Sequence, residues 1–587
     1  MVLMKQRMDR KKLFASAVCE VWRLGYHTAD LRHDLVAGLT VGIVAVPLAM
    51  ALAIASGVPP QYGLYTSIVA GVLIALTGGS RVNVSGPTAA FVVILLPVTQ
   101  QFGVGGLLVA TLMAGVILIA MGLGRMGQLI QFIPYPVTTG FTAGIAVVIA
   151  TLQLRDFFGL QMVRPQGHFL DKVVAIATAM PTLQWPDLSI ALLTLATLLL
   201  WPKLRLPVPA HLVALVVGTL SGWVGTHWVP GFDVATIGSR FHYLVNGIEG
   251  GGIPPVVPAF HLPWHLPGAD GNPLVLNLDL IQQLIAPAFA IAMLGAIESL
   301  LCSVVADGLS GYKHNPNAEL VGQGLGNIVA PFFGGITATA AIARTATNVR
   351  SGGRTPVAAV IHALVVLLSV LFFSDLLNDV PMAALAAFLM MVAWNMSEAK
   401  HFVHILRVAP RSDVAVLLVC FGLTVMFDMV IAVGIGVVMA ALLFIRRMSE
   451  LTGSRLLESH EHERLADIPE EVAVYAIRGP LFFGAAEKAM DVLQRVRGTV
   501  RVVIIDMSDV PMMDMTGMVA LESLLNRLSR GGISVVVSNL SPRIHQLLDR
   551  AGIIAGESLC FCNDLQEARE QAFSMINSLS VSGRQQP

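Results

Sequence analysis

Long apolar runs separated by short polar segments extend over most of the chain. A helix that crosses the ~30 Å hydrocarbon core of a bilayer needs roughly 20 apolar residues, and such runs recur between residues 35 and 445. The pattern predicts about fourteen spans, several of them too short to cross a membrane alone. They lie near residues 35–56, 61–78, 84–100, 104–124, 130–154, 187–201, 209–228, 281–307, 319–334, 337–350, 355–374, 380–396, 411–427 and 429–445.

Basic residues provide a check on this number of spans, because Lys and Arg concentrate in cytoplasmic loops. With the N-terminus inside, every even-numbered span ends on the cytoplasmic side. Basic residues follow each of these spans: Arg81, Arg125, Lys203, Arg205, Lys313, Arg350, Arg354, Lys400, Arg407, Arg411, Arg446 and Arg447. The segment 229–280, which has almost no Lys or Arg, then lies outside. The sequence predicts a multi-pass protein of the inner membrane with both termini in the cytoplasm.

The pattern changes after the last apolar run. A charged linker precedes short strand patterns at 472–477, 500–505 and 533–538 and amphipathic helices at about 484–497, 516–529 and 542–551. This alternation is typical of a soluble α/β domain. The expected organisation is a cytoplasmic N-terminal segment (1–34), a transmembrane domain (35–447), a linker (448–466) and a cytoplasmic α/β domain (467–578).

Composition narrows the function. Hydrophobic residues make up 55% of the 587 residues and charged residues 13%, which excludes an ordinary soluble globular protein. The 37 basic and 37 acidic residues cancel, so no global field attracts nucleic acid. The Gly-rich segment 322–326 lacks the GK[ST] of a nucleotide loop, which favours close helix packing. No catalytic triad, zincin motif or P-loop is present, so we expect no enzyme and no metal or organic cofactor.

Two of the predicted spans are broken. The third, residues 84–100, and the tenth, residues 337–350, begin after Gly, Ser or Pro at a depth where other spans are continuous. They occupy corresponding positions in two seven-span halves, and paired broken helices indicate a transporter's binding site. A helix start presents unpaired N–H groups and the positive end of a dipole. The sequence therefore predicts an anion site where the two half-helices meet.

Two charged residues lie within apolar runs, where a charge costs at least ~2.5 kcal/mol. We expect Arg344, about two turns into the second half-helix, to add positive potential to the anion site; the alternative is that it snorkels to the cytoplasm. We expect Glu298 to carry a proton or to bind a sodium ion; the alternative is a structural hydrogen bond. Asp307, Glu319 and Asp428 lie nearer the span ends, which favours solvated caps.

Three segments across the first two spans, residues 47–51, 55–65 and 77–81, resemble the signature of the SulP anion transporters. The C-terminal domain resembles the STAS domains of that family in residues 479–484 and 506–517. Within the family, residues 84–91 and 390–398 are most similar to bacterial carriers of four-carbon dicarboxylates.

The resemblance implies core and gate domains built from two inverted seven-span repeats, an elevator-like displacement and a homodimer. It implies that Glu298 binds the coupling ion, a proton or sodium. In other members a Gln is common at Leu48 and a Ser at Ala343, so the pocket here is less polar, which favours a larger anion over sulfate. The expected substrate-binding residues are Leu48, Ser85, Pro87, Thr88, Thr339, Ala341, Ala343 and Arg344.

The prediction for function is secondary active import of four-carbon dicarboxylates such as succinate, fumarate, malate or aspartate. A bicarbonate or sulfate transporter of the same family is the alternative, and a membrane-anchored STAS signalling scaffold without transport is the second alternative. The expected partners are the anion, membrane lipid, a second copy of the chain and a cytoplasmic protein bound to the STAS domain. In soluble STAS relatives a phosphorylated Ser follows the position of Asp514; here Met515 stands there, so Asp514 and Thr516 are the regulatory candidates.

Overall fold

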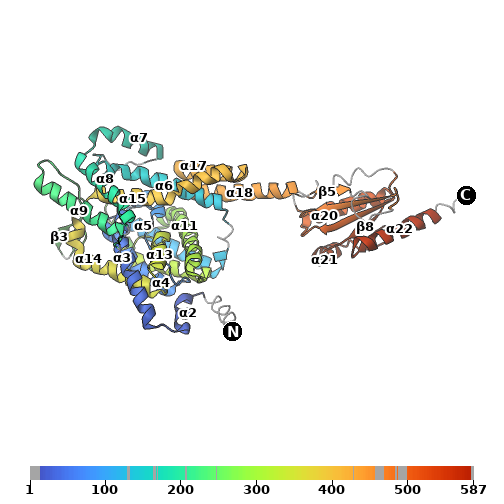
Figure 1. The fold of residues 1–587 in the computed structure, drawn as a ribbon, viewed down its shortest axis with the longest axis horizontal. Coiled ribbons are helices and arrows are strands. Elements are labelled where there is room, and N and C mark those ends of the chain that lie inside the picture. The colour runs from blue at the N-terminus through green and yellow to red at the C-terminus, as the bar shows by residue number, and fades with distance from the viewer. Residues whose placement is uncertain are drawn as a thin grey trace. The chain divides into compact units, whose positions relative to one another are not determined.

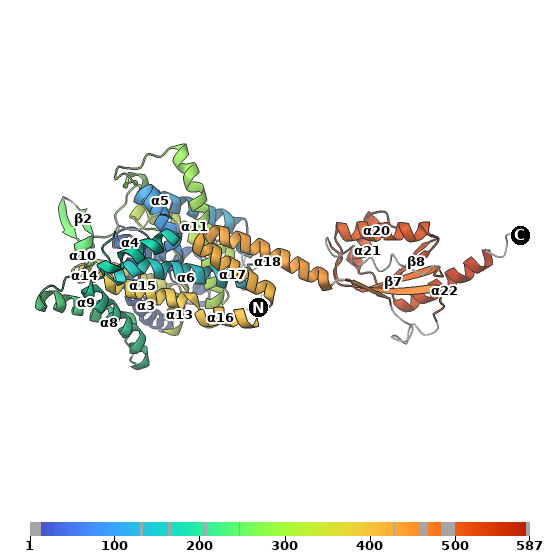
Figure 2. The same ribbon diagram turned by 90° about the horizontal axis from the view of Figure 1, so that it is seen from above.

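The apolar runs fold into helices, and the chain divides within the last of them into two units, Met1–Val437 and Val438–Pro587. The structure, a computed structural model, is shown in two views (Figure 1, Figure 2). It describes residues 13–128, 133–162, 167, 169–204, 206, 208–245, 247–427, 429–451, 453–456, 468–482, 486 and 499–582.

The first unit repeats one order of elements in its two halves. By length and composition, nine helices of the described chain could cross a membrane. The first half consists of α2 (Ser16–Leu24), α3 (Thr28–Ala55), α4 (Pro60–Thr77), β1 (Ser85–Gly86), η1 (Ala89–Phe91), α5 (Val92–Leu123), α6 (Tyr135–Phe157), α7 (Phe169–Ala179), α8 (Trp185–Leu200) and α9 (Ala210–Trp228). The second half consists of α11 (Leu278–Ser310), α12 (Pro316–Val329), β4 (Thr339–Ala340), α13 (Ile342–Arg350), α14 (Val357–Asn378), α15 (Met382–Ser397), α16 (Ala399–Val408), α17 (Arg411–Met426) and α18 (Met429–Leu451).

This order confirms the predicted fold class, an α-helical membrane domain of two repeats. Gly103 has φ 71° within α5, and this break separates the predicted spans 84–100 and 104–124. The predicted span 337–350 is helical only from Ile342, because β4 and the N-cap Ala341 precede it. Between the halves, the predicted outer segment contains a hairpin of β2 (His242–Val245) and β3 (Ile248–Gly251).

The helices of the first unit pack in two groups. In one group, α12 packs on α4, α5 and α11, and α14 packs on α3 and α4. In the other group, α15 packs on α6 and α8, α17 packs on α6, and α8 packs on α9. The pairing of α12 with α5 depends on glycine, because a Cβ at Gly324 would meet the carbonyl oxygen of Gly115 and the side chain of Ile119. Close helix packing is therefore the role of the Gly-rich segment, as expected.

The second unit is a sheet with helices on both faces. Its strand order is β5-β6-β7-β8-β9, and all neighbours are parallel except β5 with β6. One apolar cluster joins the sheet to α20 and α21, and a second joins its other face to α22 (Figure 2). The strands are β5 (Gly453–Leu456), β6 (Val472–Arg478), β7 (Val502–Asp509), β8 (Ser534–Ser538) and β9 (Leu559–Cys562), and the helices are α20 (Met515–Arg530), α21 (Pro542–Arg550) and α22 (Leu565–Ser582). The predicted helix 484–497 and most of the predicted linker lie outside the described residues.

The glycine contact between α12 and α5 predicts a stability difference between two substitutions. We expect Gly324→Ala to lower the melting temperature of the purified protein, because overpacking a well-packed site costs about 1–3 kcal/mol. Gly422→Ala in α17 is the matched control, since nothing lies within 4 Å of a Cβ built there. Thermal unfolding in detergent measures both, and equal melting temperatures for the two variants would contradict the packing role.

Candidate functional site

Two short strands from opposite halves of the first unit bring the broken spans together. β1 and β4 pair antiparallel, with Ser85 opposite Ala340 and Gly86 opposite Thr339. The backbone N–H of Ala341 also donates to the carbonyl of Val84 at 3.1 Å. Each strand is followed by a helix start, η1 and α5 after β1 and α13 after β4. Because the strands are antiparallel, the two helices start from opposite ends of this short pair and run in opposite directions.

Neither helix start is capped by its own side chain. Thr88 is the N-cap of η1 and Ala341 is the N-cap of α13, and neither side chain accepts a hydrogen bond from the turn that follows. The first N–H groups of a helix have no intrahelical partner, and the helix dipole places partial positive charge there. Together the two helix starts form a site that attracts a negatively charged group, although each supplies only a partial positive charge.

Arg344 adds a full positive charge to this place. It is the third residue of α13, so it lies in the first turn and not two turns in as the sequence predicted. The side chain is buried, at 4% relative exposure, and its Nη2 donates to the carbonyl of Pro87. Its Nη1 is buried and has no hydrogen-bond partner among the described residues. The alternative in which Arg344 snorkels to the membrane surface is therefore wrong.

Glu298 on α11 meets the same turn from the other side. Thr88 Oγ1 donates to Glu298 Oε2 at 2.8 Å. The charges of Glu298 and Arg344 interact, although the structure records no ion pair within 4 Å between them in the part of the chain it describes. The consecutive residues Pro87 and Thr88 thus contact a cation and an anion. This geometry is compatible with both expectations for Glu298, a coupling ion site and a structural hydrogen bond.

The remaining predicted residues divide between the site and its support. Ser85 Oγ accepts a hydrogen bond from Gln323 at 3.1 Å, and Thr339 Oγ1 bonds Ser299 Oγ at 2.6 Å. Both residues are buried, so these hydroxyls hold the strands in place. Ala343, by contrast, is exposed on α13 next to Arg344.

Leu48 lies outside this polar centre. It belongs to an apolar cluster with Val44, Leu198, Ala214 and Phe388, which joins α3 to α8, α9 and α15. The structure therefore brings together Pro87, Thr88, Ala341, Arg344 and Glu298, and it places Leu48 where the two groups of helices meet.

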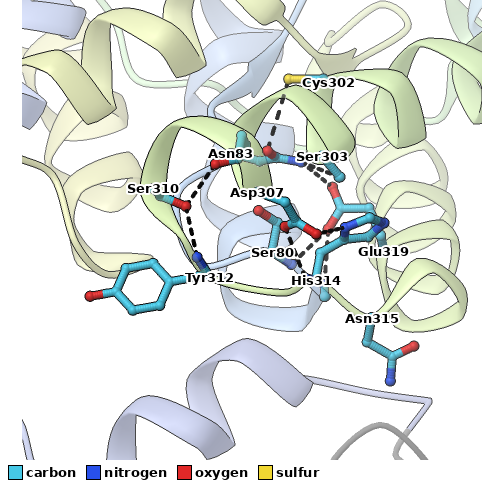
Figure 3. A network of polar contacts seen from close by, with 12 residues as sticks. Ser80, Asn83, Cys302, Ser303, Asp307, Ser310, Tyr312, His314, Asn315 and Glu319 are labelled. Atoms are coloured by element: carbon cyan, nitrogen blue, oxygen red, sulfur yellow. Dashed lines mark hydrogen bonds and ion pairs between the residues drawn. The ribbon is translucent and has the colours of Figure 1, made fainter.

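A buried polar network behind β1 was not predicted (Figure 3). Its centre is Glu319, at 1% relative exposure, which accepts hydrogen bonds from Gly79, Ser80, Asn83 and Gln323. The predicted solvated cap at Glu319 is therefore wrong. Asp307, near the C-terminal end of α11, is hydrogen-bonded to the N–H and the ring of His314 in the segment that follows. Asp428 lies outside the described residues.

The sequence carried a signal for this network. Polar residues recur every four positions in α12, at Glu319, Gln323 and Asn327. They therefore lie on one face of the helix, and all three are buried. Polar side chains repeated at this spacing within an apolar run indicate a satisfied buried network, because an unpaired buried polar group is costly.

In the second unit, the regulatory candidates lie at the start of α20. Asp514 is the N-cap, and its Oδ1 accepts a hydrogen bond from the N–H of Gly517 at 2.8 Å. Thr516 is exposed in the first turn, where an added phosphate would meet the positive end of the helix. Burial, together with nearby Glu567, raises the pKa of the Cys562 thiol to about 11, so Cys562 is a packing residue of the sheet.

Comparisons with known proteins place both units in known families. Residues 31–420 match the sulfate permease family, and residues 464–568 match the STAS domain. The "Putative sulfate transporter YvdB" of Bacillus subtilis (strain 168) is 41% identical over 90% of this chain and 95% of its own length. The bicarbonate transporter BicA of Picosynechococcus sp. is 31% identical over 85% of this chain and 87% of its own length.

Two solved structures share the fold. The transmembrane domain of a cyanobacterial bicarbonate transporter BicA has a TM-score of 0.58 at 29% identity, covering 71% of this chain and 98% of that chain. SLC26A9 has a TM-score of 0.80 at 18% identity, covering 99% of this chain and 95% of that chain. At 18% identity this second similarity shows the fold alone, for both units.

Because a hydrogen bond from α13 supports the strand pair, we expect substitutions at two threonines of this helix to differ in their effect on stability. Thr345 Oγ1 accepts the hydrogen bond of the buried Val84 N–H at 3.1 Å, whereas Thr347 Oγ1 bonds only the carbonyl of Ala343 in its own helix. We expect Thr345→Val to destabilise the protein by about 1–3 kcal/mol, because it leaves a buried N–H unpaired. Thr347→Val should stay within about 0.5 kcal/mol of the parent protein.

Denaturant unfolding followed by tryptophan fluorescence measures both variants. Equal stability of the two would show that the Val84 amide does not depend on Thr345.

Proposed function

Because the chain belongs to the sulfate permease family and carries a STAS domain, we propose that it is a secondary active transporter of a small oxyanion, with bicarbonate and sulfate as the first candidates. The observation that carries the proposal is the meeting of two uncapped helix starts beside the buried guanidinium of Arg344. The relatives are named as transporters of sulfate or bicarbonate, and the chain is an anion transporter and not an enzyme.

The charge of the site fits an oxyanion. Each helix start contributes about half an elementary positive charge, and Arg344 contributes a full one. An ionised Glu298 cancels part of this, which leaves a net charge of about +1 that suits a monoanion such as bicarbonate. Protonation of Glu298 would raise the net charge to about +2 and suit a dianion such as sulfate. The protonation state of Glu298 is therefore linked to the charge of the anion that the site holds.

This linkage supports a coupling role for Glu298. Its carboxylate accepts a hydrogen bond from the hydroxyl of Thr88, and Thr88 is the N-cap of η1, the first of the two helix starts. A proton or a sodium ion at Glu298 changes the field at that helix start directly, so cation and anion bind cooperatively. A gradient of either cation can then drive the anion.

Four-carbon dicarboxylates rank below bicarbonate and sulfate. The relatives reported above are named for sulfate and bicarbonate, and dicarboxylate transport was inferred from a likeness in two short segments. The less polar surroundings expected from Leu48 and Ala343 give one reason to include succinate in any substrate panel.

Orientation and assembly complete the proposal. Ile342 at 48% relative exposure, Ala343 and Arg350 form an exposed face of α13 that leads away from the site. If the basic loops lie inside, as the sequence predicts, this face opens toward the cytoplasm. We also propose an inner-membrane location with both termini in the cytoplasm, a homodimer, and an elevator-like movement of the helices that hold β1 and β4.

The role of Arg344 predicts loss of transport without loss of folding. In proteoliposomes with an imposed proton or sodium gradient, we expect uptake of labelled bicarbonate or sulfate, and we expect Arg344→Ala to lower kcat/KM at least about tenfold, since a charged hydrogen-bond donor is lost. Arg350→Ala, at the exposed end of the same helix, is the matched control and should keep the parent KM.

A panel of bicarbonate, sulfate and succinate at several pH values identifies the anion. Failure of the parent protein to take up any of the three under either gradient would reject the proposed function.

The role of Glu298 predicts uncoupling. We expect Glu298→Gln to abolish accumulation against a gradient and to leave anion exchange across the membrane, because a neutral carboxamide cannot take up a proton or balance a sodium ion. Asp279→Asn, at the exposed start of the same helix, is the control. Uptake is measured with and without the cation gradient, and gradient-driven accumulation in Glu298→Gln equal to that of the parent would show that Glu298 makes only a structural hydrogen bond.

A further inference from the structure

The carboxylate of Glu319 gathers four hydrogen-bond donors in the interior of the first unit. Oε2 accepts the backbone N–H groups of Gly79 and Ser80 at 2.9 and 3.0 Å. Oε1 accepts the carboxamide nitrogens of Asn83 and Gln323 at 3.0 and 3.1 Å. The side chain is buried, at 1% relative exposure, and within the described chain no ion pair involves it. Neutral donors and the start of α12 alone balance its charge.

Four donors and no acceptor face the Glu319 side chain, which suits an acceptor-only carboxylate. Two of them are backbone N–H groups at Oε2, and two are side-chain carboxamides at Oε1. Hydrogen bonds to a charged acceptor are about twice as strong as neutral ones. Glu319 therefore fixes the positions of its four partners more firmly than a neutral side chain would.

Three of the four donors belong to one segment, residues 79–85, and the fourth donates to a side chain of that segment. Gly79, Ser80 and Asn83 lie in this segment, and Gln323 also donates to Ser85 Oγ, where β1 begins. Figure 3 shows Ser80 and Asn83 beside Glu319. The fit is tight, since a Cβ at Gly79 would collide with the carbonyl of Asn315. Contacts with α12 therefore fix the path of the chain into β1.

The same segment feeds the anion site. Its Val82 carbonyl accepts from Asn348 Nδ2 at 2.8 Å, and its Val84 pairs with Ala341 and Thr345. A shift of residues 79–85 would therefore move β1 along β4 and displace Pro87 and Thr88 relative to Arg344 and Glu298. No contact of Glu319 with Pro87, Thr88, Arg344 or Glu298 is recorded within the described chain, so it acts on the anion only through this segment.

We propose that Glu319 is a positioning residue of the transport site, whose ionised carboxylate sets the register in which β1 meets β4 and hence the spacing of the two helix starts. The transport consequence rests on the proposed function, whereas the effect on the strand pair does not. In Glu319→Gln the new NH₂ group at the position of Oε2 would face two backbone N–H groups, and two hydrogen bonds would be lost. At the position of Oε1 it would face the carboxamides of Asn83 and Gln323, which could accept from it only by turning their NH₂ groups away from Ser303 and Ser85.

The experiment separates positioning from general folding. For purified Glu319→Gln we expect KM for the anion to rise about tenfold per folded molecule with a smaller change in kcat, because displacing a contact group by about 1 Å weakens binding strongly. We also expect faster hydrogen–deuterium exchange in residues 339–345, which do not contact Glu319 but pair with β1. Asp307→Asn is the matched control, since Asp307 bonds His314 and not the segment 79–85.

The outcomes decide the proposal. A raised KM with faster exchange at 339–345 in Glu319→Gln, and neither in Asp307→Asn, supports it; an unchanged KM and unchanged exchange in folded Glu319→Gln overturn it. If Glu319→Gln does not fold, Gln323→Met, which removes one donor and the bond to Ser85, takes its place with the same readouts and a smaller expected change, and unchanged values again overturn the proposal. If the parent protein transports no anion, the proposed function fails, and the exchange of 339–345 still decides the positioning role.

Discussion

The first unit depends on one constraint: a helix broken inside a bilayer must find partners for its free N–H and C=O groups within the protein. Two chain segments face this problem, one leading into β1 and the other into β4. Polar side chains on one face of α12 supply these partners to both segments. Glu319 accepts the amides of Gly79 and Ser80, Gln323 bonds Ser85, and Asn327 both donates to and accepts from the backbone of Ala338 at 2.9 and 2.8 Å.

Because these side chains satisfy the broken segments, the polar groups that remain are the ones available to a ligand. The hydroxyls of Ser85 and Thr339 are hydrogen-bonded to α12 and α11. Neither N-cap side chain caps the first N–H groups of the two helices, and Arg344 Nη1 has no partner in the part of the chain that the structure describes. With a neutral residue at position 344, only the partial positive charges of the two helix starts would lie near the ionised form of Glu298. Arg344 Nη1 and the two uncapped helix starts are therefore the groups that the proposed anion would meet.

The features of the site that could be predicted from the sequence are those whose signal lies in neighbouring residues. A charge within an apolar run is expensive wherever it lies, so Arg344 and Glu298 stood out, and Gly, Ser and Pro at mid-span revealed the broken helices. The two-residue strands β1 and β4 have no period to detect, so the start of α13 at Ile342 was missed and Arg344 was placed a turn too far along. Glu319 was misjudged as a solvated cap because three of its four partners lie about 240 residues away. Its spacing from Gln323 and Asn327 was the available signal.

The kinds of contact within and between the two groups of helices bear on the proposed elevator-like movement. α12, β1, β4, α11 and α13 are joined by hydrogen bonds between buried polar groups, which are directional and lost over small displacements. The cluster of Val44, Leu48, Leu198, Ala214 and Phe388, which joins α3 to α8, α9 and α15, is apolar. Apolar contacts are non-directional, so one surface can slide over another while the buried area is kept. Such contacts would allow the proposed movement of the helices around β1 and β4 as one rigid body against the second group. Leu48 lies at the boundary, where a polar side chain would need a hydrogen-bond partner in every position of that movement.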